Sequence, residues 1–161
     1  MHIFSVISDS FLGVTPYGAN SFWLMPLLSR MRSILLVDDD ANTRVTLRDF
    51  LTEAGYVVHA ARDGQHALHM LEKIDPPDLI LLDYKMPVMD GKQFLSVQRR
   101  TPRLENIPVV ILSAATREWS GAHLEVEEVL SKPVDLDLLL TTVNQICIPP
   151  TTEQTATRER L

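Results

Sequence analysis

Two short runs of purely apolar residues, each followed at once by an aspartate, constrain this sequence more than any other feature. Residues 34–37 read ILLV before Asp38, and residues 79–82 read LILL before Asp83. Unbroken apolar runs of this length are typical of strands buried on both faces, as in parallel sheets covered by helices on each side. The two runs therefore predict central strands of an α/β sheet.

Further strands and helices alternate with these runs from residue 32 onward. The apolar runs and their spacing predict strands at 33–37, 56–60, 79–82, 109–112 and 126–130. Helices are predicted at 42–54, after a cap at Asp63, from Gly91 to before Pro102, and after a cap at Asp135. The alternation of strand and helix predicts five βα units around a parallel sheet. We expect a doubly wound, flavodoxin-like (βα)5 sandwich whose five strands take the order 2-1-3-4-5, one of the common orders of such sheets.

The length of 161 residues is about that of one domain. We expect residues 1–31 to be an N-terminal extension, either disordered or the product of an upstream start codon, because Met31 directly precedes the first strand. An amphipathic contact arm is the alternative for this segment. Residues 32–148 are predicted to form the domain, and residues 149–161 a disordered polar tail.

Charge and composition exclude several classes of function. The formal net charge of -6 disfavours direct binding to nucleic acid, which needs clustered basic residues. The chain has no apolar stretch long enough to span a bilayer and no pattern of a secretory signal, so we expect a cytoplasmic protein without a membrane partner. Cys147 is the only cysteine, which rules out an intramolecular disulfide.

Polar side chains follow the predicted strands at the edge where an open parallel sheet binds its ligands. The residues concerned are Asp38, Asp39 and Asp40 after the first strand, Asp83 after the third, Ser113 after the fourth and Lys132 after the fifth. Carboxylates packed in one cleft repel each other unless a cation neutralises them, and hard oxygen ligands favour Mg²⁺, with Mn²⁺ as a second choice. A cation and a lysine beside a carboxylate nucleophile form a site suited to phosphoryl transfer.

The sequence resembles the response-regulator receiver family of two-component signalling. The resemblance rests on four motifs and covers residues 32–147. The motifs are ILLVDDD at 34–40, DLILLDYKMPVMDG at 78–91, VILSA at 110–114 and SKP at 131–133. It implies a non-enzymatic module of the stand-alone chemotaxis type, which takes a phosphoryl group from a histidine kinase or histidine phosphotransfer protein, hydrolyses it slowly, and signals through a phosphorylation-dependent face.

The same resemblance assigns roles to individual residues. Asp83 is the implied phosphoacceptor, and Asp38 and Asp39 are the acidic pair that holds the cation with Asp83. The backbone carbonyl of Lys85 is a further implied metal ligand. Ser113 is the implied switch hydroxyl, and Lys132 is the implied counter-charge of the phosphate. The resemblance also implies a cis peptide bond between Lys132 and Pro133.

The chain departs from the family pattern at two places. Val129 stands where the family usually has an aromatic or histidine switch residue, and the segment between Ser113 and Lys132 is a few residues shorter than usual. We therefore expect the Ser113 hydroxyl to move toward phosphate without an accompanying aromatic flip.

Two other functions fit part of the pattern. A phosphohydrolase of the haloacid dehalogenase type would use Asp38 as nucleophile and Asp40 as general acid, although Asn42 stands where that family has threonine or valine. A pseudo-receiver would dock or dimerise without phosphate. The phosphate would label Asp83 in the receiver, Asp38 in the hydrolase and neither residue in the pseudo-receiver.

Overall fold

The computed structural model describes residues 31–114 and 126–147. Its elements are β1 (Ser33–Val37), α2 (Ala41–Glu53), β2 (Val57–Ala61), α3 (Gly64–Leu71), β3 (Leu79–Asp83), α4 (Gly91–Gln98), β4 (Val109–Ser113), β5 (Glu128–Ser131) and α5 (Leu136–Cys147). The strands form one parallel sheet in the order β2-β1-β3-β4-β5, which confirms the predicted topology. The predictions for residues 1–30, for the segment 115–125 and for the tail from residue 148 fall outside the described residues.

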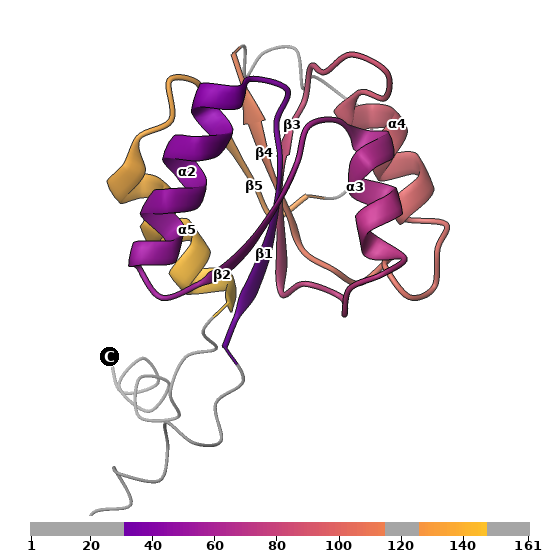
Figure 1. The fold of residues 1–161 in the computed structure, drawn as a ribbon, viewed down its shortest axis with the longest axis horizontal. Helices are drawn as coiled ribbons and strands as arrows, with labels where there is room; N and C mark the ends of the chain where they lie inside the picture. The colour runs from indigo at the N-terminus through magenta and orange to yellow at the C-terminus, as the bar shows by residue number, and fades with distance from the viewer. Residues whose placement is uncertain (1–30, 115–125, 148–161) are drawn as a thin grey trace, which may run out of the picture. The chain divides into compact units, whose positions relative to one another are not determined.

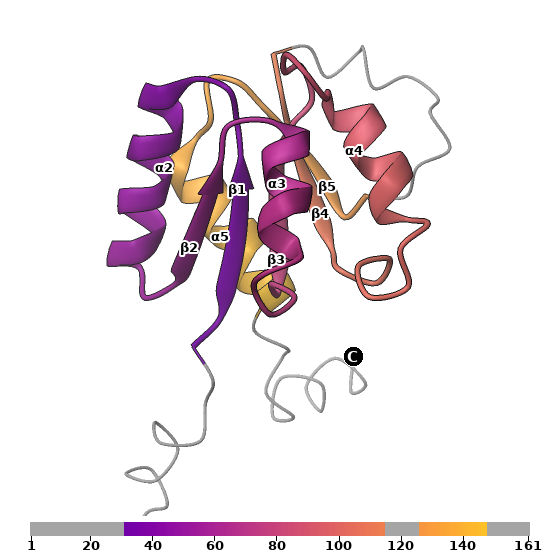
Figure 2. The ribbon, with the colours of Figure 1, turned by 45° about the vertical axis from the view of Figure 1, so that its right-hand side comes forward.

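The sheet lies between two layers of helices. Seen along the sheet edge, α2 and α5 cover one face, and α3 and α4 cover the other (Figure 1). The turned view shows α3 in front of the strands and α5 behind them, with α2 at the left and α4 at the right (Figure 2). Because all strands are parallel, their carboxyl ends share one edge, at the top of Figure 1, where the chain leaves β1 and β3 toward opposite faces.

The alternation of side chains along β1 explains why its sequence is apolar throughout. Ile34 and Leu36 belong to the core cluster with the buried residues of α2 and α5, whereas Leu35 and Val37 belong to the cluster with those of α3 and α4. All four side chains have 0% exposure. Successive residues of a strand point to opposite faces, so a strand covered on both sides has no solvent-facing position for a polar residue.

Aspartates begin the first three described helices. Their carboxylates accept backbone N–H groups three residues on, as Asp40 from Thr43 at 2.7 Å, Asp63 from His66 at 2.7 Å and Asp90 from Gln93 at 2.8 Å. Asp135 binds the N–H of Leu138 in the same way at the start of α5. Gly55, with a φ of 96°, ends the turn after α2 in the left-handed conformation that favours glycine. In the part of the chain that the structure describes, no helix combines the length and apolar character that crossing a membrane requires.

Several predicted boundaries are wrong by one or two residues. Tyr56 precedes β2 because its N–H bonds to the carbonyl of Leu51. The strand β5 begins at Glu128 rather than at residue 126, and its Val129 packs half-buried against the core. Pairing also continues past the apolar runs, so that Asp83 and Ser113 are the last residues of β3 and β4 rather than the residues after them.

Candidate functional site

Three carboxylates converge at the carboxyl edge of the sheet. Asp38 directly follows β1 and Asp83 ends β3, and these strands are neighbours in which Val37 lies opposite Leu82. One carboxylate oxygen from each of Asp38, Asp39 and Asp83 lies within 4.8 Å of the others. Asp38 is 0% exposed and Asp83 5%, whereas Asp39 faces solvent. This donor set of hard oxygens is one that could hold a divalent cation.

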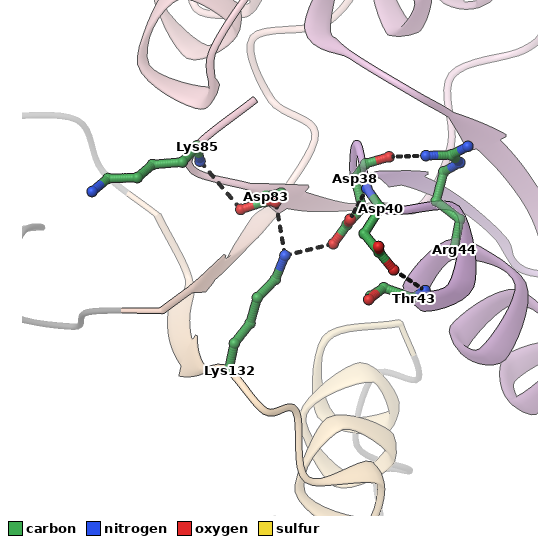
Figure 3. Close-up of polar contacts among 7 residues, drawn as sticks. All are labelled: Asp38, Asp40, Thr43, Arg44, Asp83, Lys85 and Lys132. Carbon is green, nitrogen blue, oxygen red and sulfur yellow. Dashed lines mark hydrogen bonds and ion pairs between the residues drawn. The ribbon is translucent and has the colours of Figure 1, made fainter. Parts of the chain in front are cut away.

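Lys132, which follows the edge strand β5, brings a positive charge into this cluster. Its Nζ donates hydrogen bonds of 2.7 Å to Asp38 Oδ2 and 2.7 Å to Asp83 Oδ2 (Figure 3). The residue follows β5, and its backbone N–H donates to the carbonyl of Ser113, the buried last residue of β4, at 2.8 Å. The Lys132 side chain therefore extends past the end of β4, where Ser113 lies, to reach the two acids.

Burial and charge act in opposite directions on the pKa values of this pair. Burial raises the pKa of Asp83 above its ordinary value, although the hydrogen bond and charge of Lys132 pull it down and the charge of Asp38 adds to the rise. Burial by itself would lower the pKa of Lys132, but its hydrogen bonds to Asp38 and Asp83 outweigh burial and the pKa is raised. Lys132 is therefore protonated at neutral pH.

Asp40 and Lys85 lie next to the cluster in different ways. Asp40 caps α2, and the N–H of Thr43 lowers the pKa of its carboxyl. The backbone N–H of Lys85 donates to Asp83 Oδ1 at 3.2 Å, while its side chain extends away from Lys132 (Figure 3). Lys85 and Asp39 both line a surface cavity of about 490 Å³. The proposed role of the Lys85 carbonyl stays a prediction.

The loop between Asp83 and α4 closes tightly on the acid that starts it. The N–H of Gly91 donates to the carbonyl of Tyr84 at 3.0 Å, and a Cβ at Gly91 would lie 2.8 Å from the carbonyl oxygen of Asp83. Within the loop, Val88 has a φ of 70°, a conformation that β-branched residues rarely adopt. The first residue of α4 is thus in direct contact with the backbone of Asp83.

The same loop is bound to the start of α3. The N–H of Gly64 donates to the carbonyl of Met89 at 3.1 Å. A Cβ at Gly64 would lie 2.7 Å from the Cγ of Met89, so only glycine fits beneath this side chain. The contacts of Gly64 and Gly91 could not be predicted, because no local sequence pattern marks a glycine that a distant segment covers.

One further residue at the site carries no sequence signal. Arg44, in the first turn of α2, donates a hydrogen bond of 2.6 Å from its Nη1 to the backbone carbonyl of Asp38 (Figure 3). An arginine at this helical position is most simply interpreted as a solvated cation, and only the folded chain shows that it reaches back to the end of β1.

Comparisons with known proteins agree on one family. Residues 34–144 match the family model described as the response regulator receiver domain. An uncharacterized 14.6 kDa protein in the sodA1 3' region of Leptolyngbya boryana is 37% identical, and the match covers 78% of this chain and 98% of that protein. The response regulator MprA of Mycobacterium ulcerans is 36% identical over 66% of this chain, which spans only 46% of MprA.

Solved structures of receiver proteins have the same fold. The chemotaxis response regulator CheY4 of Vibrio cholerae superposes with a TM-score of 0.67 and 32% identity, over 73% of this chain and 99% of that one. A response regulator receiver protein from Pseudomonas putida gives a TM-score of 0.68 at 27% identity, with coverage of 73% and 99%. With the matching family model, the strand order and the acids at the strand ends, these similarities show that the chain belongs to the response regulator receiver domain family of two-component signalling.

Proposed function

We propose that this chain works as a single-domain response regulator, in which Asp83 accepts a phosphoryl group from a histidine kinase or a histidine phosphotransfer protein. The observation that carries the proposal is the pair of 2.7 Å bonds from Lys132 to the carboxylates of Asp83 and Asp38. A nucleophilic carboxylate with a fixed cation beside it suits a reaction that brings more negative charge into the site. The match to nearly the whole length of the Leptolyngbya protein supports action as a single domain.

The proposed step forms one bond and breaks one. An oxygen of the Asp83 carboxylate attacks the phosphorus of a phosphohistidine in line with the P–N bond, and an O–P bond forms as the P–N bond breaks. The electron pair of the broken bond stays on the imidazole nitrogen, and the product is an acyl phosphate. Lys132 neutralises charge on the transferred group, and the hydroxyl of Ser113 donates a hydrogen bond to one of its oxygens.

The acidic cluster suits Mg²⁺, or Mn²⁺ in its place. The carboxylates of Asp38, Asp39 and Asp83 supply hard oxygen donors, and we propose the backbone carbonyl of Lys85 as a fourth, since its N–H already places that residue beside Asp83. When bound, the cation neutralises negative charge on the phosphoryl oxygens. Because Lys132 already bonds to two of these acids, the chain itself balances part of their charge.

We propose further that the chain is a signalling module in the cytoplasm with slow self-dephosphorylation, rather than an enzyme with turnover. Its phosphorylation would alter a face that binds an effector protein. The phosphohydrolase alternative needs Asp40 as general acid, but its carboxylate caps α2 by accepting the N–H of Thr43. The pseudo-receiver alternative is tested by whether Asp83 takes up phosphate at all.

The test compares the wild-type chain with Asp83→Asn by intact mass after incubation with acetyl phosphate and Mg²⁺. We expect the wild type to gain the mass of one phosphoryl group only when Mg²⁺ is present, and the variant to gain none. A labelled Asp83→Asn variant whose phosphate maps to Asp38 would indicate the hydrolase. A wild type that gains no phosphoryl group from acetyl phosphate or from a phosphorylated histidine phosphotransfer protein would favour the pseudo-receiver.

A further inference from the structure

Arg44 links α2 to the chain segment that carries two of the acids. Its half-buried side chain runs back from the first turn of the helix, and Nη1 donates a 2.6 Å hydrogen bond to the backbone carbonyl of Asp38 (Figure 3). A hydrogen bond from a charged donor is shorter and stronger than a neutral one. Arg44 therefore holds one particular peptide unit, the one that joins Asp38 to Asp39.

The position of Asp39 depends on that peptide unit. Asp38 is anchored in other ways as well, because its N–H donates to the carbonyl of Ala61 at 3.1 Å and its Oδ1 accepts the N–H of Asp40 at 2.8 Å. Asp39 is exposed, so packing does not fix it. A peptide unit is planar, and fixing its carbonyl oxygen therefore fixes the direction in which the chain enters Asp39.

We infer that Arg44 is a positioning residue for the cation site, and that it acts by holding the Asp38–Asp39 peptide. The bond keeps the carboxylate of Asp39 within 4.8 Å of those of Asp38 and Asp83. The inference rests on the proposed function, since it concerns the Mg²⁺ that phosphorylation of Asp83 would require. It adds a residue of α2 to a site otherwise formed at strand ends.

Charge and position predict opposite effects for the loss of Arg44. A guanidinium near the acids repels a second cation, so an arginine that acted only through its charge would weaken Mg²⁺ binding, and its removal would strengthen it. An arginine that orients a ligand has the reverse effect. Residues that hold metal ligands in place typically contribute about 10- to 100-fold to affinity.

The experiment measures dissociation constants of Mg²⁺ by calorimetry and of Mn²⁺ by electron paramagnetic resonance on the full chain. Arg44→Met keeps an apolar stem but removes the charge and the donor, and we expect roughly tenfold weaker binding of both ions. Arg44→Lys, which restores a charged donor, should recover part of the affinity. The control is Arg48→Ala, one turn further along α2, because Arg48 is exposed and bonds to the adjacent Asp49. This control should bind like the wild type.

Unfolding curves recorded without divalent ions check that each variant is folded. Binding by Arg44→Met that equals or exceeds the wild-type affinity would overturn the inference and leave the proposed function intact. An Arg44→Lys variant as weak as Arg44→Met would also overturn it, because the defect would then not follow from the missing donor. A wild-type chain that binds neither ion would overturn the inference and the proposed Mg²⁺ dependence together.

Discussion

Replacing Lys132 with methionine removes the positive charge between two buried carboxylates and keeps a side chain of similar length. In the wild type, Nζ lies 2.7 Å from Asp38 Oδ2 and 2.7 Å from Asp83 Oδ2. Two carboxylates at the 4.8 Å limit of this cluster repel each other by about 3 kcal/mol at an effective dielectric constant of about 20. Removing one partner of a buried ion pair costs about 3–5 kcal/mol. We therefore expect Lys132→Met to lower the free energy of unfolding by about 3–5 kcal/mol at neutral pH.

The loss should depend on pH in a defined direction. Burial and the charge of Asp38 raise the pKa of Asp83, and Lys132 opposes that rise, so the pKa is higher still in Lys132→Met. The folded variant then keeps a proton at pH values where the unfolded chain has released it. Its stability therefore increases as pH falls from neutral toward the unfolded value of 3.8. The difference in the free energy of unfolding between Lys132→Met and the wild type should therefore shrink as the pH falls.

The assay is urea unfolding followed by circular dichroism, in chelator, at about pH 7.5 and about pH 4.5. Lys92→Met serves as the control, because Lys92 is an exposed lysine on α4. Adding Mg²⁺ at neutral pH should restore part of the lost stability, since a ligand of the folded state stabilises it. A deficit of equal size at both pH values, or one no larger than that of the control, would refute the electrostatic reasoning.

Four further changes probe the backbone and the core. Gly91→Ala should cost about 1–2 kcal/mol and slow the phosphorylation of Asp83, because the new Cβ would lie 2.8 Å from the carbonyl of that acid. Gly55 has a φ of 96° and open space around it, so Gly55→Ala should lower the free energy of unfolding by about 1–2 kcal/mol without slowing phosphorylation. Equal phosphorylation rates in Gly91→Ala and Gly55→Ala would contradict this. Val88→Asn should raise the free energy of unfolding by about 0.5–1 kcal/mol, since asparagine tolerates the φ of 70° and Val88 is 75% exposed; a measured loss would count against backbone strain. Burial raises the pKa of Cys147 from 9.0 to about 11, so the unfolded chain releases this proton first and stability should fall between those pH values. The fall should be larger than in Cys147→Ala by on the order of 2–3 kcal/mol, and parallel pH curves would argue against a buried thiol.

The central part of the fold could be predicted because burial on both faces leaves a direct trace in the sequence. The runs at 34–37 and 79–82 became β1 and β3, and the aspartates after or at their ends lie together. Strand ends were less predictable, because an apolar pattern stops at the first polar residue whereas backbone pairing does not. Asp83 is paired with Leu112 for this reason, although its side chain is the first polar one of its strand.

The parts of the site that escaped prediction all depend on segments that meet only in the folded chain. Arg44 has an ordinary helical position, and its bond to Asp38 arises from how α2 folds back on β1. Gly91 has no positive φ that would demand glycine, so its role shows only in the nearby carbonyl of Asp83. Local sequence rules describe a residue and its neighbours along the chain, and they carry no information about such contacts.

The contact between Gly64 and Met89 has a consequence for recombining receiver domains. The turn after β2 and the loop after β3 are far apart in sequence, yet Met89 covers a place where any side chain on residue 64 would collide with it. A chimera with a crossover between these two segments could place a larger residue at position 64 beneath a side chain that leaves room only for glycine. Crossovers placed after Gly91 would instead transfer both segments as one unit, and with them the backbone that presents Asp83.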